Sequence, residues 1–226
     1  MTEFAVKNYL LSLALAILVT LAPAAVQAQE ANPKDQQYLD LVAKANANPA
    51  AAIDWAALRQ LYTQTSFYDP YGGAQAIWYG LQQAGQVIAT DPSEANVKAY
   101  RTLLDRHFAH YRAHLQAIDF WNKTKSPLIN KEFHERAFRD ILRSIRLTGD
   151  GKTPATAFRV IDPAEEQMIL KTFHFRLVSQ EFRQNKSRPL DVLKYVNPQT
   201  SAPTDKPQVQ EMFFDVTAIV RAQPAR

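Results

Sequence analysis

The sequence predicts an α+β fold, in which N-terminal antiparallel helices pack on a small C-terminal antiparallel sheet. Up to residue 147, apolar residues recur every three or four positions, which is the period of amphipathic helices. From residue 173 they alternate with polar residues, which is the period of strands. Gly149-Asp150-Gly151 separates the two patterns, because glycine adopts the conformations that end helices and form tight turns. We therefore expect a helical region at 29–147 and a strand-rich region at 148–226, together forming one compact domain.

The first 28 residues have the features of a secretory signal peptide. Lys7 precedes an apolar run from Leu10 to Ala22, and the small residues Val26 and Ala28 stand at the cleavage positions. The apolar run is shorter than the roughly 20 residues that a membrane-spanning helix needs. We expect cleavage after Ala28 and an exported product, periplasmic or secreted, with no membrane span after cleavage.

Composition argues against several classes of function. The formal net charge of +4 arises from 26 basic and 22 acidic residues, with no basic block of the kind that binds nucleic acid. The chain contains no cysteine, which excludes disulfides, cysteine-based zinc sites and a cysteine nucleophile. No cofactor motif is present, so we expect neither a nucleic-acid partner nor a cofactor.

The apolar periodicity predicts five helices before the junction. Asp54 is suited to cap the second helix, and Asp91 with Pro92 to begin the fourth. Because the apolar stripe of that fourth helix continues from Val97 to Ile118, the pattern predicts one long helix. The Asp-Pro turn between two helices resembles a degenerate tetratricopeptide hairpin, although no 34-residue repeat is present. The first expected helix ends near residue 48, and the other four span 55–62, 74–89, 92–118 and 130–147.

After the junction, short strands and one brief helix are expected. Phe158 to Ile161 forms the first strand, and Pro163 begins a helix that continues to about Lys171. Alternating residues then predict strands at 173–178, 190–196 and 209–220. Polar connectors between them favour an antiparallel sheet with one face covered by the helices.

An aromatic loop lies between the second and third helices. It runs from Ser66 to Gly73, contains Tyr68 and Tyr71, and is defined by Asp-Pro and Gly-Gly steps that break helices. One interpretation is that its rings fill a gap between helices. The other is that they form a platform for stacking, sugar or peptide contacts.

The histidines invite a metal hypothesis, which spacing weakens. With a rise of about 1.5 Å per residue, His107 and His114 would lie about 10 Å apart along one helix, so at most two of His107, His110 and His114 could share an ion. No acidic partner accompanies them, and we predict no metal site. His134 falls on the apolar stripe of the last helix, where it is either a buried, hydrogen-bonded histidine or a site residue.

The junction itself lacks the spacing of known ion-binding loops. Gly151-Lys152-Thr153 matches the end of a phosphate-binding loop, but Arg146 stands where the first glycine is required and no strand precedes it. A calcium loop needs several carboxylates, whereas this run has Asp150 alone.

The ordered set of motifs resembles a bacterial exported family, domain of unknown function 4919. The resemblance is carried by the run from Ile145 to Ile161, by the segment from Leu58 to Tyr71, and by several shorter marks. Thr148 and Gln167 depart from the pattern, where serine and an aromatic residue are usual. Because the family has no established activity, the resemblance implies the fold and export but no catalytic role. The shorter marks are His134, Glu165-Glu166, Leu170, Gln180, Asp191 and Phe213 to Val216.

These observations favour a noncatalytic periplasmic or secreted module that binds a small ligand or an envelope protein. Its groove is expected between the helices and the sheet. An alternative is a hydrolase in which His134 is the general base and Asp150 orients it, and another is a structural envelope protein in which Asp150 only stabilises the turn. The sequence leaves an enzymatic role open. The candidate ligand-binding residues are Tyr68, Tyr71, His134, Asp150 and Lys152.

Overall fold

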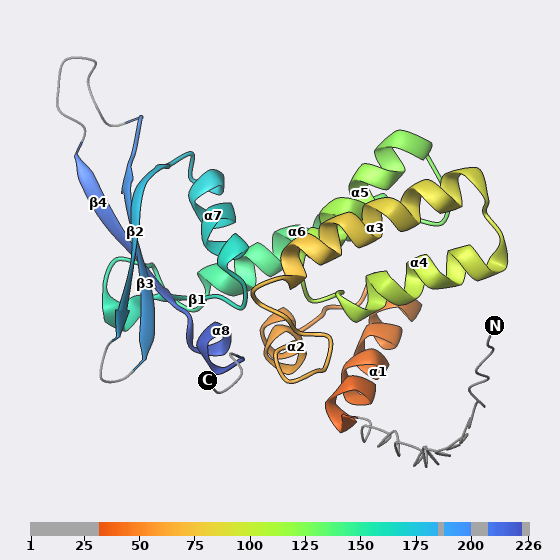
Figure 1. Cartoon of the computed structure of the whole chain (residues 1–226), viewed down its shortest axis with the longest axis horizontal. Helices are drawn as coiled ribbons and strands as arrows, with labels where there is room; N and C mark the ends of the chain where they lie inside the picture. Colours follow the sequence, from red (N-terminus) through yellow and green to blue (C-terminus); the bar gives the residue numbers. More distant parts are fainter. Residues whose placement is uncertain (1–31, 185–187, 200–207, 223–226) are drawn as a thin grey trace, which may run out of the picture. The chain divides into compact units, whose positions relative to one another are not determined.

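The computed structural model describes residues 32–184, 188–199 and 208–222, and the predicted signal peptide lies outside these ranges. Side-chain caps begin several of the helices: Asp54 accepts a hydrogen bond from the Ala57 amide, as predicted, and Asn130 accepts one from Phe133. The helices that precede the first strand in the described chain are α1 (Pro33–Ala47), α2 (Trp55–Tyr62), α3 (Gly73–Thr90), α4 (Glu94–Arg106), α5 (Tyr111–Thr124) and α6 (Lys131–Arg146) (Figure 1).

The prediction of one long helix after Pro92 is wrong, because α4 and α5 are separate helices. The chain turns between them, and the His110 side chain caps α5 by accepting a hydrogen bond from the Arg112 amide at 3.2 Å. The turn also buries Phe108 completely, with its ring stacked on Trp55 at 5.5 Å between centroids. The apolar period continues through this break, so it did not reveal the turn.

The C-terminal region forms a mixed, mostly antiparallel sheet, which confirms the α+β class. Its strand order is β1-β4-β3-β2, and β1 pairs with β4 in parallel while the other neighbours are antiparallel. In the parallel pair, Phe158 and Arg159 of β1 lie beside Phe214 and Asp215 at the end of β4. The elements are a 3₁₀ turn (Pro154–Thr156), β1 (Phe158–Arg159), α7 (Pro163–Thr172), β2 (Arg176–Gln184), β3 (Pro189–Val196), β4 (Val209–Asp215) and α8 (Thr217–Arg221).

Several predicted strand boundaries differ from the structure: β1 ends at Arg159 instead of residue 161, and the strand expected to end at residue 178 continues to Gln184. The strand expected from residue 173 begins at Arg176, because the chain turns at His174, whose φ is 57°. Phe175 still packs on the sheet, with its ring stacked on Tyr195 at 4.3 Å. The strand expected to reach residue 220 ends at Asp215, whose carboxylate accepts the Thr217 amide at 3.0 Å as α8 begins.

Helices and strands share one apolar core. Phe108 and Ile141 from the helical region belong to the same buried cluster as Leu193 and Phe214 from the sheet. A second cluster lies between α3, α4 and α5. Because the first cluster spans both regions, its packing fixes the positions of α2, α6, β1 and α8, which surround the site described below.

Candidate functional site

The two tyrosines of the aromatic loop have structural hydrogen bonds. The Tyr68 hydroxyl donates to the Ile161 carbonyl at 2.7 Å, and the Tyr71 hydroxyl donates to the Ile219 carbonyl at 3.2 Å. Tyr68 is partly buried against the main core, whereas the Tyr71 side chain is 55% exposed. The loop therefore connects the start of α3 to the end of β1 and to α8.

His134 lies in the core, beside a second histidine. Its Nδ1 is 2.9 Å from Nδ1 of His114, and Nε2 of His114 is 2.7 Å from the Phe108 carbonyl. Since a carbonyl only accepts, Nε2 of His114 carries the proton, and neutral His114 then accepts from His134 at Nδ1. Burial lowers the pKa of His134 to about 4 and, with His134 beside it, lowers that of His114 well below its usual value. Both rings are therefore neutral at physiological pH.

Asp150 and Lys152 lie in the exposed junction turn. Asp150 accepts hydrogen bonds from the Thr156 hydroxyl at 2.5 Å and the Lys152 amide at 3.0 Å, and these bonds lower the pKa of Asp150. The Lys152 ammonium is 4.0 Å from Asp150, with both side chains largely exposed. Asp150 thus stabilises the turn that leads into β1.

The five predicted residues do not converge. Among the described residues, no hydrogen bond or ion pair joins the tyrosine loop, His134 and the junction turn. His134 and Asp150 in particular have different partners. The geometry gives no support to an acid–base pair formed by those two side chains.

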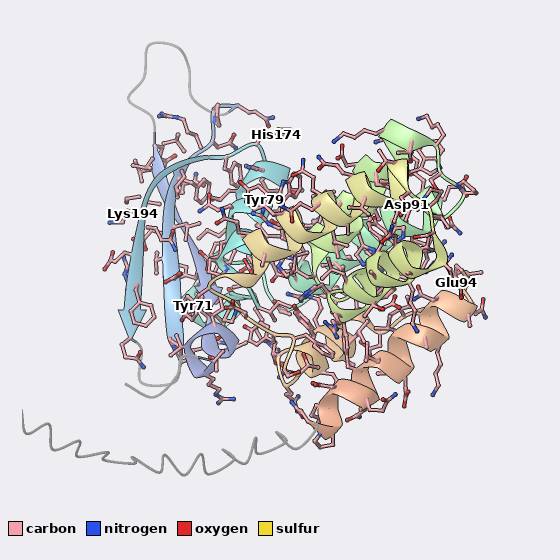
Figure 2. All side chains as sticks on the ribbon, turned by 45° about the vertical axis from the view of Figure 1, so that its right-hand side comes forward. Tyr71, Tyr79, Asp91, Glu94, His174 and Lys194 are labelled. Carbon is pink, nitrogen blue, oxygen red and sulfur yellow. The ribbon has the colours of Figure 1, made fainter. Side chains whose placement is uncertain are left out.

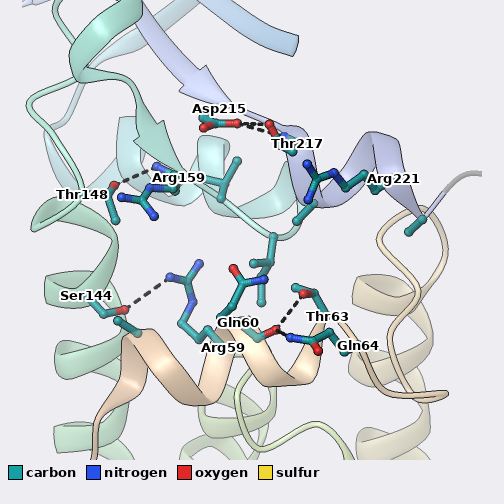
Figure 3. A pocket seen from close by; sticks show the side chains of 15 residues that line it. Arg59, Gln60, Thr63, Gln64, Ser144, Thr148, Arg159, Asp215, Thr217 and Arg221 are labelled. Atoms are coloured by element: carbon teal, nitrogen blue, oxygen red, sulfur yellow. Dashed lines mark hydrogen bonds between the residues drawn. The ribbon is translucent and has the colours of Figure 1, made fainter. Parts of the chain in front are cut away.

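A different set of residues surrounds a hollow of about 600 Å³ between α2, α6, β1 and α8. We call it the arginine pocket, because Arg59, Arg159 and Arg221 all line it. Figure 3 shows Arg59 and Gln60 on α2 and the other two arginines on the opposite side. The further polar lining comes from Gln64, Ser144, Thr148, Asp215 and Thr217.

Arg59 is the buried member of the pocket. Its residue is 4% exposed, and its guanidinium contacts Glu165 at 2.6 Å and the Ser144 hydroxyl at 3.4 Å. The same Glu165 oxygen accepts the Ile161 amide at 2.9 Å, so α2, α7 and the end of β1 meet at one carboxylate. Nε of Arg59 is buried without a hydrogen-bond partner in the described chain. An unpaired buried donor is costly, so this atom is a destabilising feature at the buried side of the pocket.

Arg159 and Arg221 are the exposed members of the pocket. Within the described ranges, neither guanidinium has a hydrogen-bond or ion-pair partner; the Arg159 main-chain amide donates to Thr148 at 2.8 Å. Asp215 is the one carboxylate in the described lining, and it is already bonded to Arg188 at 3.2 Å and to the Thr217 hydroxyl at 2.5 Å. The pocket therefore carries uncompensated positive charge.

Sequence reasoning missed these arginines for two reasons. Arg59 lies between Leu58 and Leu61 on the buried side of α2, and a cation on an apolar face is a signal that could have identified it. Arg159 and Arg221 carried no such signal, since 62 residues separate them and only tertiary packing brings them to one hollow. Nine of the fifteen lining residues nonetheless belong to the segments 58–71, 145–161 and 213–216 that carry the family resemblance, whereas Arg221 lies outside them.

Two further properties concern the described part of the chain. No group of three or more histidine, aspartate or glutamate side chains there is arranged to hold a metal ion. None of its helices combines the length and the apolar character needed to cross a membrane.

Comparison with curated proteins and with solved structures gave no match. Comparison with protein-family models matched residues 30–223, which include every residue of the arginine pocket. The chain therefore belongs to the family described as Domain of unknown function (DUF4919).

Proposed function

We propose that this protein is an exported, noncatalytic module that binds a small ligand bearing an oxyanion in the arginine pocket. The observation that carries the proposal is the charge of the pocket: the guanidinium groups of Arg159 and Arg221 have no carboxylate partner among the described residues, because Asp215 is paired with Arg188 and Glu165 with Arg59. Guanidinium groups bind carboxylate, phosphate and sulfate oxygens through paired N–H donors. Export is supported by the signal-like composition of residues 1–28.

The hydrogen bonds of the pocket indicate which groups are free to bind. Ser144 and Thr148 donate their hydroxyl protons to the carbonyls of Ile141 and Ile145, at 2.7 Å and 2.6 Å. Thr217 donates its hydroxyl to Asp215. Ligand recognition therefore depends on the two exposed guanidinium groups, those of Arg159 and Arg221.

The same bonds argue against nucleophilic catalysis at this site. A hydroxyl becomes a nucleophile when a base accepts its proton, and these three hydroxyls donate to carbonyls or to a carboxylate held by Arg188. No histidine lines the pocket in the described chain. A binding role fits this arrangement better than hydrolysis.

Thermal melts of the mature chain with phosphate, sulfate and citrate test the proposal. A ligand at about 100 times its Kd should stabilise the folded protein by about 2.7 kcal/mol, which raises the Tm. Arg159→Gln and Arg221→Gln should each remove most of this shift. The matched control is Arg139→Gln, which deletes the same charge from an exposed position on α6 outside the pocket.

If none of the three anions raises the Tm more in the wild type than in Arg159→Gln, the binding role is wrong. A purely structural envelope protein would then be the better account. Equal losses in Arg139→Gln would show general charge screening instead of a site.

A further inference from the structure

A second cleft, lined mainly by α3, α5 and α7, shares no lining residue with the arginine pocket. It consists of two hollows of about 790 and 480 Å³. Trp78, Arg112, Pro163 and Ala164 line both hollows, which are therefore adjacent. Each hollow falls within the range of about 300–1,000 Å³ typical of ligand sites. No pocket-lining arginine of the first site contributes to it.

Aromatic rings line this cleft and remain accessible. Tyr71 is 55% exposed and Tyr79 is 52% exposed (Figure 2). Trp78, the residue before Tyr79 in α3, is half-buried. The Tyr71 ring is also fixed, because its hydroxyl is bonded to the Ile219 carbonyl. Accessible rings held in place offer flat apolar faces at low entropic cost.

Arg112 places an uncompensated cation among these rings. Its guanidinium lies 5.9 Å from the centre of the Trp78 ring and 5.8 Å from that of Tyr111, and its Nε donates to the Tyr111 hydroxyl at 3.2 Å. No carboxylate of the described residues pairs with it. The acid that lines the cleft, Asp162, is buried, accepts the Ala164 amide at 2.6 Å and lies 3.3 Å from His110. The outer N–H groups of Arg112 are free to bind an anion.

Planar amides complete the polar lining. Gln75 lines the smaller hollow and Gln167 the larger one, and neither side chain has a hydrogen-bond partner in the described ranges. Lys171 adds a second cation to the larger hollow. The cleft thus combines flat rings with free donors and acceptors and a net positive charge.

We propose that this cleft binds an oligosaccharide that carries carboxylates, such as a chain of uronic acids. The C–H faces of a pyranose ring pack on flat aromatic rings, and its hydroxyls bond to planar amides. Its carboxylate would pair with the two outer nitrogens of Arg112 in a bidentate contact. A polyproline peptide would use the rings but has no group for the free cation. The cleft does not depend on the function proposed for the arginine pocket.

Titration of the full mature chain with tetragalacturonate and with its methyl ester tests the proposal, since the ester keeps the sugar rings and removes the charge. We expect saturable binding of the acid at about 1 mM or below. Arg112→Gln should weaken binding of the acid at least tenfold. Tyr79→Ser, at a position exposed enough to leave packing intact, should weaken binding of both compounds. The matched control Trp121→Leu changes an aromatic residue of α5 outside the cleft and should alter affinity less than twofold.

Four results would overturn the proposal: no saturation by about 10 mM acid, equal affinity for acid and ester, unchanged affinity in Arg112→Gln, or competition by decaproline at the same site. Arg159→Gln separates the two sites. It should remove most of the oxyanion binding in the arginine pocket and leave tetragalacturonate binding unchanged.

Discussion

Glu166 shows how burial changes the chemistry of a single residue in this fold. The residue is 0% exposed, and Gln180 donates to both Glu166 and Asp191, at 3.2 Å and 2.9 Å. Burial, together with the negative charge of Asp191 and a hydrogen bond shared with it, raises the pKa of Glu166 to about 9. Glu166 is therefore protonated at neutral pH, when an unfolded glutamate, with a pKa near 4.5, is ionised.

This difference predicts a pH-dependent stability. Between pH 7 and 9 the native state binds one proton more than the unfolded state, so the free energy of unfolding should fall by up to about 1.4 kcal/mol per pH unit. Glu166→Gln should remove this slope, because the amide has no proton to release. Urea unfolding at pH 7, 8 and 9 measures it, with the exposed Glu132→Gln on α6 as control. An unchanged slope in Glu166→Gln would show that Glu166 is ionised in the native state.

Arg59 is a second residue whose environment predicts a large effect. Arg59→Met would leave Glu165, which is 0% exposed, without its cation, and removing one partner of a buried ion pair costs about 3–5 kcal/mol. The double variant Arg59→Met, Glu165→Gln should recover part of this loss, because it removes the unpaired charge. Urea midpoints measure both, with Arg139→Met as control. A loss below about 1 kcal/mol in Arg59→Met would contradict the role of the ion pair.

At the scale of elements, the junction turn connects α6 to the sheet through Gly151. Its φ is 68°, and an added Cβ would lie 2.5 Å from a ring carbon of Phe158 and 3.1 Å from Met212. Two backbone hydrogen bonds hold Gly151 in place. Its amide donates to the Thr156 carbonyl, and its carbonyl accepts from the Phe213 amide, both at 2.8 Å. The turn is therefore fixed between the core and β4.

Gly151→Ala should destabilise the protein by at least about 1–3 kcal/mol, from the left-handed backbone alone, and by more through the clash. Gly80→Ala is the matched control. Gly80 lies within α3, and its added Cβ would meet only the end of the Leu103 side chain of α4. That change should alter stability by no more than about 1 kcal/mol. Thermal melts compare the two, and equal effects would refute the constraint at Gly151.

For the whole molecule, local patterns predicted the α+β class, the cap at Asp54, and the order of the four strands with α7 between the first and the second. They did not predict the break at His107 to His110, because Phe108 continues the apolar period while its ring is buried among side chains distant in sequence. They also did not predict the arginine pocket. Arg59, Arg159 and Arg221 lie on three elements that only the shared core brings together.

The candidate residues chosen from sequence illustrate the same limit. Tyr68 and Asp150 were identified as polar or aromatic residues in unusual loops, and the structure gives both of them backbone partners that stabilise those loops. Tyr71 has such a bond and also lines the smaller hollow of the second cleft. Sequence thus indicated where the chain turns, whereas the location of uncompensated charge required the three-dimensional packing.

Calorimetric titration of phosphate and citrate into the mature chain and into the double variant Arg159→Gln, Arg221→Gln tests the proposed oxyanion site most directly. We predict saturable binding of at least one anion to the wild type and no saturable binding to the double variant, whose Tm without ligand should stay close to that of the wild type because both side chains are exposed. Binding of equal affinity in the two proteins, or no binding to the wild type, would contradict the proposal.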